Sequence, residues 1–243
     1  MNKILSIFDR YPDLVIGFST KSDGNMRLKP SDSIKIDIQA KKNRRIFLDS
    51  LGINEKSVVD PILEHGTNIL IVNDIDGGKT FKNVDALITA RPGIFLNLTV
   101  ADCLSIFLYD HDKKVIALVH AGWRGLQDKI IENVLAKLKE FYNSDPSSII
   151  VGIGPHIGGC HYEIQDDVSE KFREYPGAFI NKEGHKFFDI GIVAETQLTN
   201  LGFRSENIEV NSECTFELTD KYFSFRRDKP RIIETMLAVF GMK

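Results

Sequence analysis

Short apolar runs and one amphipathic stretch dominate the first third of the chain. Residues 14–20 form an apolar run typical of a strand, followed by a polar loop that contains glycine. Ser31 or Ser33 is suited to cap a helix that runs to about Gly52. Strand-like runs return at 58–63, 68–73 and 85–89. The apolar positions of the predicted helix are Ile34, Ile36, Ile38, Ile46, Phe47 and Leu51.

The best-defined hairpin is predicted between residues 97 and 120. Its arms, 97–109 and 115–120, are joined by the turn 110–113. If Tyr109 pairs with Lys114 across this turn, Cys103 faces His120. Facing side chains have Cβ atoms about 4.5–5.5 Å apart, within reach of one shared ion. A slip of one residue would send the two side chains to opposite faces.

Helices and strands interleave in the rest of the chain. Helical periodicity follows Gly125 and continues through Tyr142. We expect further helices at 167–174 and 190–201, and strands at 149–153, 208–210 and 234–240. Since a hairpin excludes a wholly parallel sheet, the pattern predicts one α+β domain, residues 1–243, with mixed sheets and covering helices. The apolar stripe of the first of these helices is Ile130, Ile131, Val134, Leu135, Leu138 and Phe141.

Charge and composition exclude several classes of protein. The 243 residues carry 31 basic and 34 acidic side chains, a net charge of -3, so a nucleic-acid partner is not expected. No apolar stretch is long enough to span a membrane, and Asp9 and Arg10 interrupt the apolar start of the chain, which predicts a cytoplasmic protein. Three cysteines, an odd number, favour reduced thiols that are free to bind metal.

A metal centre built on the hairpin needs a third ligand besides the facing cysteine and histidine. A thiolate with an imidazole suits zinc better than magnesium or calcium. His65 lies at a strand junction, while His156 and His161 lie in the glycine-rich segment 152–164 and are rivals for the same role. His111 lies in the hairpin turn and His185 in a polar loop. The residues alone leave the choice open.

Seven segments of the chain occur in the order seen in one known family. The chain resembles the YfiH/YlmD family, also called polyphenol oxidase laccase-like, over nearly its whole length. The pair ADC at 101–103 and HAGWRG at 120–125 is the most specific part of the match. The matching segments are 63–66, 85–89, 101–103, 120–125, 154–163, 214–215 and 223–227.

The resemblance implies a fold, a metal site and an activity. The fold would be a layered α/β/β/α arrangement with mixed sheets, related to deamidating toxins with a cysteine-hydrolase fold. A Zn²⁺ ion would be held by His65, Cys103 and His120. The activity would be phosphorolysis of adenosine, inosine or methylthioadenosine, together with hydrolytic deamination of adenosine. The partners would be a purine nucleoside and phosphate, and we expect a monomer or weak homodimer.

The type and position of further residues suggest catalytic and substrate-binding roles. Cys103, His120 and Arg124 are the expected catalytic residues, with Arg124 the first candidate for binding an anion. Asp102 would point away from Cys103 in a regular strand, which fits orientation or capping as well as proton transfer. Substrate-binding candidates are Trp123, Arg226, Arg227 and Lys21, the last standing where the family has arginine.

Three other functions compete with a zinc-dependent nucleoside enzyme. Oxidation of phenols by several copper ions needs more histidines than the six present, so we reject that mechanism. As the single metal of the site, copper is possible but zinc is preferred. Cys103 could be a nucleophile with His120 as its base, performing amidase or acyl-transfer chemistry without metal. A non-enzymatic alternative is a zinc-stabilised editing factor for peptidoglycan precursors.

Overall fold

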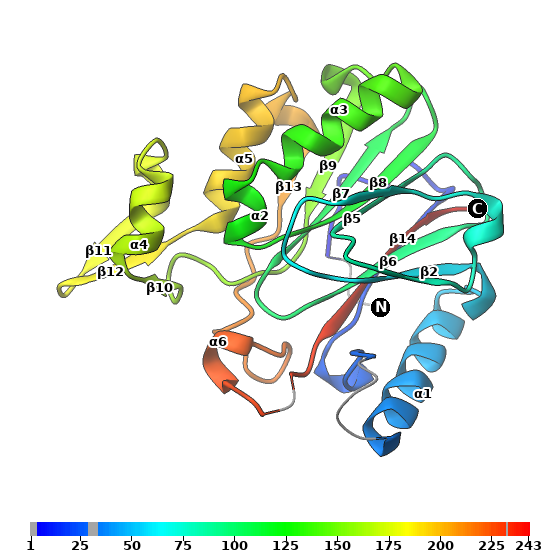
Figure 1. The fold of residues 1–243 in the computed structure, drawn as a ribbon, viewed down its shortest axis with the longest axis horizontal. Coiled ribbons are helices and arrows are strands. Elements are labelled where there is room, and N and C mark those ends of the chain that lie inside the picture. The colour runs from blue at the N-terminus through cyan, green and yellow to red at the C-terminus, as the bar shows by residue number, and fades with distance from the viewer. Residues whose placement is uncertain (1–3, 29–33, 232) are drawn as a thin grey trace.

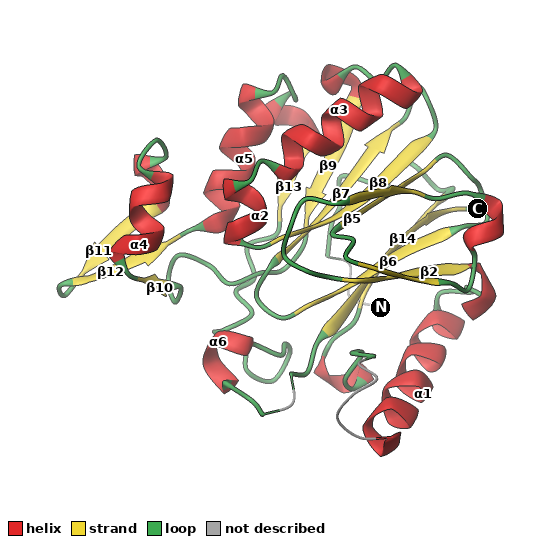
Figure 2. Cartoon of the chain, viewed as in Figure 1, coloured by secondary structure: helices red, strands yellow, loops and turns green. Residues whose placement is uncertain are grey.

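Two large sheets lie face to face, and a small third sheet projects from one side (Figures 1 and 2). The computed structural model describes residues 4–28, 34–231 and 233–243. The five-stranded sheet has the order β1 (Leu14–Phe18), β14 (Met236–Met242), β6 (Phe95–Val100), β2 (Val58–Ile62), β4 (Thr80–Lys82). The six-stranded sheet has the order β13 (Ile208–Val210), β9 (Ile149–Ile153), β7 (Leu104–Asp110), β8 (Val115–Ala121), β5 (Ala86–Thr89), β3 (Ile69–Ile71). The small sheet has the order β10 (Glu163–Ile164), β12 (His185–Phe188), β11 (Phe179–Lys182). Both large sheets contain parallel and antiparallel pairs, which confirms mixed sheets.

Alternation along the strands creates the layers. In β14, Met236, Ala238 and Phe240 face the second large sheet, whereas Leu237 and Val239 face outward. In β8, Ile116 and Leu118 enter the same inter-sheet core. Every residue of β7, β8, β9 and β14 is buried, because each of these strands is covered on both faces.

Helices cover the two outer faces, and the predicted α/β/β/α layering is confirmed (Figure 1). Phe47 and Leu48 of α1 (Ile34–Ser50) pack on the five-stranded sheet. The six-stranded sheet is covered by α3 (Ile130–Tyr142) and α5 (Ile190–Asn200). Shorter helices are α2 (Trp123–Gln127), α4 (Asp166–Ser169) and α6 (Phe225–Asp228). None of the helices in the described ranges is long and apolar enough to cross a membrane.

Several details of the sequence-based expectations were wrong. Ile38 and Ile46 of α1 are exposed, and Phe141 at the end of α3 is exposed as well, because each helix buries a narrower stripe than its apolar residues suggested. The caps predicted at Ser31 or Ser33 lie outside the described residues. The helix at residues 225–228, strand β4 and the small sheet were not anticipated.

One end of the six-stranded sheet collects the loops that carry most of the candidate chemistry. The register pairs Ala86 with Val119 and Leu104 with Ala121, so the starts of β5 and β7 lie beside the end of β8. The parallel pairs β3–β5 and β13–β9 bring the loop before β3 and the segments after β9 and β13 to the same end. Residues far apart in the sequence therefore meet there.

Candidate active site

His65, Cys103 and His120 meet at this end of the sheet. One ligand atom from each lies within 4.8 Å of those of the other two. The His65 and His120 rings are 4.7 Å apart and nearly perpendicular. His65 comes from the loop between β2 and β3, Cys103 directly precedes β7, and His120 is the penultimate residue of β8. The structure thus groups the three residues that the family resemblance selected.

The strand pairing that places Cys103 beside His120 differs from the predicted hairpin. Ser105, not Cys103, pairs with His120, so the register differs from the prediction by two residues. The first arm is also two strands, since β6 and β7 belong to different sheets. Between them Asp102 has a positive φ of 88°, which turns the chain just before Cys103. A two-residue shift keeps the same face of the strand, which is why the sulfur still approaches His120.

Asp85 organises two of the three candidate ligands. Its Oδ1 accepts from the His65 amide at 2.8 Å and lies 3.0 Å from His120 Nδ1, while Oδ2 accepts from the Gly66 amide at 2.9 Å. Burial opposes ionisation of Asp85, but the hydrogen bonds from His120 and the backbone amides hold its pKa below its usual value. A carboxylate on Nδ1 leaves Nε2 to face the centre, as in many metal sites. Sequence reasoning placed Asp85 at the start of a strand and in a segment that matches the family, but gave it no role at the site.

Cys103 and His120 form a polarised pair. Burial alone would raise the pKa of Cys103, but the charge and hydrogen bond of His120, with a contribution from His65, lower it to about 6. Burial alone would lower the pKa of His120, but Cys103 and Asp85 raise it to about 9. A thiolate beside an imidazolium is therefore the favoured state of the metal-free pair, and the thiolate is the form that binds metals.

Gly122 gives the sulfur its space. A Cβ at this position would lie 3.0 Å from Cys103 Sγ and 3.5 Å from His65 Cδ2. The next residue begins α2, so the chain turns away immediately after His120 and Ala121. The absence of a side chain at Gly122 thus keeps one side of the centre open.

Arg226 packs against Tyr162, whose phenol is influenced by the charge of Cys103. The Arg226 guanidinium lies 4.8 Å from the centre of the Tyr162 ring and donates to the Glu163 carbonyl at 2.6 Å. Burial and then the negative charge of Cys103 raise the pKa of Tyr162 to about 12, against the opposing influence of both arginines. The charges of Cys103, Arg226 and Arg124 therefore all act on the Tyr162 phenol.

Trp123 holds cations on its ring. The Arg124 guanidinium lies 4.2 Å and the Lys171 ammonium 4.9 Å from the ring centroid. The indole is half-buried against the core formed with α3 and α5. This arrangement holds Arg124 in place at the start of α2.

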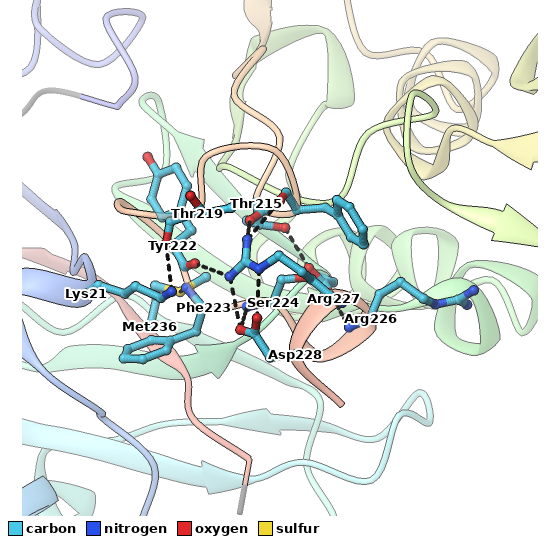
Figure 3. Close-up of polar contacts among 12 residues, drawn as sticks. Lys21, Thr215, Thr219, Tyr222, Phe223, Ser224, Arg226, Arg227, Asp228 and Met236 are labelled. Atoms are coloured by element: carbon cyan, nitrogen blue, oxygen red, sulfur yellow. Dashed lines mark hydrogen bonds and ion pairs between the residues drawn. The ribbon is translucent and has the colours of Figure 1, made fainter. Parts of the chain in front are cut away.

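Arg227 is engaged with its own surroundings (Figure 3). Its Nη atoms donate to the carbonyls of Thr215, Phe216 and Tyr222, and its Nε and one Nη donate to Asp228, so all five N–H donors are used. In Figure 3 the Arg226 side chain points away from Arg227.

Lys21 is held by contacts with Thr219 and Phe223. Its Nζ donates to the Thr219 carbonyl at 2.6 Å and lies over the Phe223 ring. Substrate roles for Arg227 and Lys21 stay predictions, and the structure gives both side chains a structural task.

Asp102 joins three segments beneath the centre. Its Oδ1 accepts from Thr215 Oγ1 at 2.7 Å, and its Oδ2 accepts from Ser224 Oγ at 3.0 Å and the Arg226 amide at 2.7 Å. The last of these bonds caps α6, which is the orientation or capping role considered from the sequence.

The rival histidines lie elsewhere. His156 is buried and directs Nδ1 to the Gly154 carbonyl at 2.9 Å. His161 belongs to a separate group with Cys160 and Cys214. His111 pairs with Asp112, and His185 pairs with Glu163.

A sequence profile described as multi-copper polyphenol oxidoreductase laccase matches residues 19–243. The chain belongs to this laccase family. The purine nucleoside phosphorylase YlmD of Bacillus subtilis is 29% identical over 250 residues, covering 95% of this chain and 89% of that protein. A purine nucleoside phosphorylase of Bacteroides thetaiotaomicron is 28% identical over 202 residues, covering 78% of this chain and 75% of the relative.

Two solved structures share the fold over nearly the whole chain. The hypothetical protein YfiH of Bacillus licheniformis superimposes with a TM-score of 0.89 at 29% identity, covering 99% of this chain and 96% of that one. YlmD of Geobacillus stearothermophilus gives 0.89 at 28% identity, covering 98% and 94%. The family description names copper, and a thiolate with two imidazoles is a donor set that suits copper and zinc alike.

Proposed function

We propose that this protein is a zinc-dependent purine nucleoside phosphorylase with its centre at His65, Cys103 and His120. The observation that carries the proposal is the convergence of these three side chains, supported by relatives that are named purine nucleoside phosphorylase. Three protein ligands with a free fourth position are typical of catalytic rather than structural zinc.

The donor set fits a zinc ion. Asp85 orients His120, the lowered pKa of Cys103 favours the thiolate, and Gly122 leaves room beside the sulfur. When bound, Zn²⁺ would supply Lewis acidity that polarises a substrate oxygen and acidifies water. His65 is the exposed member of the set, which favours approach of a substrate from its side.

Phosphate would bind through Arg124 and Arg226. The Arg226 guanidinium packs on the Tyr162 ring, the charges of both arginines act on the Tyr162 phenol, and Arg124 is exposed at the start of α2. Planar guanidinium groups bind phosphate oxygens in pairs, so two of them would fix the attacking phosphate against the sugar. The Trp123 ring would hold Arg124 in this position. Trp123 is also our candidate for contact with the nucleoside.

A decisive assay follows products from metal-quantified protein. Adenosine or inosine is incubated with and without phosphate, and adenine, hypoxanthine and inosine are quantified. We expect free base only with phosphate; inosine formed from adenosine without phosphate would show the deamination that the resemblance also implies. His65→Ala should abolish turnover, whereas His111→Ala, a histidine in the distant hairpin turn, should not. No product from any purine nucleoside with zinc-loaded protein would overturn the proposal.

A second candidate function is metal-free acyl transfer by Cys103 and His120. It is favoured by the low pKa of the thiol and the raised pKa of its imidazole partner. The two functions respond oppositely to a chelator. Nucleoside turnover that is lost on zinc removal and regained on zinc addition supports the phosphorylase, while amide hydrolysis that increases in metal-free protein supports the acyl-transfer enzyme.

A further inference from the structure

A second group of metal-binding side chains lies outside the proposed centre. Cys160, His161 and Cys214 place one ligand atom each within 4.8 Å of the others. His161 Nδ1 lies 3.1 Å from Cys160 Sγ and 3.9 Å from Cys214 Sγ. The group contains both cysteines that the phosphorylase proposal leaves without a role.

Local backbone structure builds this group. The Gly158 carbonyl accepts from the amides of His161 and Tyr162, which closes a tight turn and lets two consecutive side chains approach one point. A bridge between His156 and Cys214 brings the distant segment alongside this turn. These backbone contacts bring the three side chains together, with His161 Nδ1 within hydrogen-bonding distance of both sulfurs.

Two further contacts prepare the group to bind a cation. The Gly158 amide donates to Cys214 Sγ at 3.3 Å, an interaction that stabilises negative charge on sulfur. The His161 ring stacks on Phe216 with centroids 4.6 Å apart, which fixes the direction of Nδ1. Supporting contacts of this kind orient ligands in metal sites.

We propose that Cys160, His161 and Cys214 form a second metal site, which takes Zn²⁺. Two sulfurs and one imidazole nitrogen are a soft ligand set that selects zinc over magnesium and calcium. Ligand atoms on one tetrahedral zinc lie roughly 3.5–3.8 Å apart, given Zn–S and Zn–N bonds of about 2.3 and 2.0 Å. The observed separations of 3.1 and 3.9 Å need only small side-chain movements to match.

The site joins two segments that border the proposed centre. Its turn leads into Tyr162, and the other segment continues into Thr215 and Phe216, whose carbonyls accept from Arg227. A bound ion would hold these segments together and stabilise the folded state. A disulfide between Cys160 and Cys214 is the alternative, but it would leave the stacked imidazole and the Gly158 amide without a function.

Zinc titration of Cys103→Ser isolates the second site, because this variant loses the thiolate of the first. We expect Cys103→Ser to bind one equivalent of Zn²⁺ and to melt at a higher temperature with zinc than with chelator. Adding Cys160→Ser should remove both effects. This second change is at an exposed side chain, so folding should persist, and circular dichroism checks it. With Co²⁺ in place of zinc, Cys103→Ser should show a thiolate charge-transfer band that is weaker in the double variant.

Several outcomes would overturn the second site. Zinc binding by Cys103→Ser that persists at full strength in the double variant would place the ion elsewhere, and no binding by Cys103→Ser with its fold intact would remove the site. A Cys160–Cys214 disulfide, found by peptide mass spectrometry of protein kept under reducing conditions, would replace it. Cys160→Ser alone should retain nucleoside turnover, so failure of the second site and failure of the phosphorylase proposal are separable.

Discussion

Asp85→Asn tests how the proposed centre is organised. The carboxylate is buried, and each of its oxygens faces at least one N–H group, from His65, Gly66 or His120. Asparagine has the same shape but carries an NH₂ group in place of one oxygen. Either orientation of the amide therefore sets a donor against a donor, and the negative charge that keeps His120 in position is lost.

The expected magnitude follows from these contacts. Loss of a carboxylate behind a metal-binding histidine costs roughly 10- to 100-fold in metal affinity, which is about 1.4–2.7 kcal/mol. One buried N–H left without an acceptor should lower the free energy of unfolding by about 1–3 kcal/mol in metal-free protein. Zinc affinity is measured by competition with a chromophoric chelator in a Cys160→Ser background, which removes the proposed second site. Stability is measured by urea unfolding in excess chelator.

Asp102→Asn is the matched control. Asp102 is also buried and accepts several hydrogen bonds, but from Thr215, Ser224 and Arg226 rather than from the candidate ligands. We expect it to lose stability while keeping its affinity for zinc. Equal losses of zinc affinity in both variants would show that the effect is general loosening, and unchanged affinity in Asp85→Asn would refute the orienting role.

Three other results are expected. Gly122→Ala should weaken zinc binding about tenfold, because the added methyl group would crowd the Cys103 sulfur. Gly177→Ala is the control, since a Cβ at that position meets nothing within 4 Å. Equal zinc affinities of the two variants would show that Gly122 does not provide space for the sulfur. In metal-free protein, alkylation of Cys103 should accelerate as the pH rises through about 6, because the thiolate is the form that reacts. Burial and the Cys214 sulfur raise the pKa of Cys160 to about 11, so alkylation of Cys160 should be slow at pH 7. Peptide mass spectrometry distinguishes the two cysteines, and faster labelling of Cys160 would contradict the assignment. Arg227→Ala should lower the free energy of unfolding in urea by at least about 3 kcal/mol, because five hydrogen bonds are lost. An unchanged midpoint of the urea unfolding curve would show that these hydrogen bonds contribute little.

Local pattern was sufficient for many of the regular elements, although not for β4, the small sheet or the helix at 225–228. The strand 208–210 and the helix that begins at Ile190 were predicted because their apolar residues repeat at the period of the element, and periodicity is a property of neighbours in the chain. The mixed sheets followed from one hairpin among interleaved helices. The identity of the candidate ligands came from a resemblance, since the residues alone left His65, His156 and His161 open.

Tertiary structure decided what surrounds those ligands. The run 97–109 reads as one strand, but the positive φ of Asp102 divides it between two sheets, and no local pattern reveals which sheet a strand will join. Asp85 supports His65 and His120 across 20 and 35 residues of sequence, and Cys160 meets Cys214 only because β9 and β13 end side by side. Sequence patterns specify which face of an element is buried, whereas contacts between distant loops depend on how the sheets pair, which is set by the packing of the whole chain.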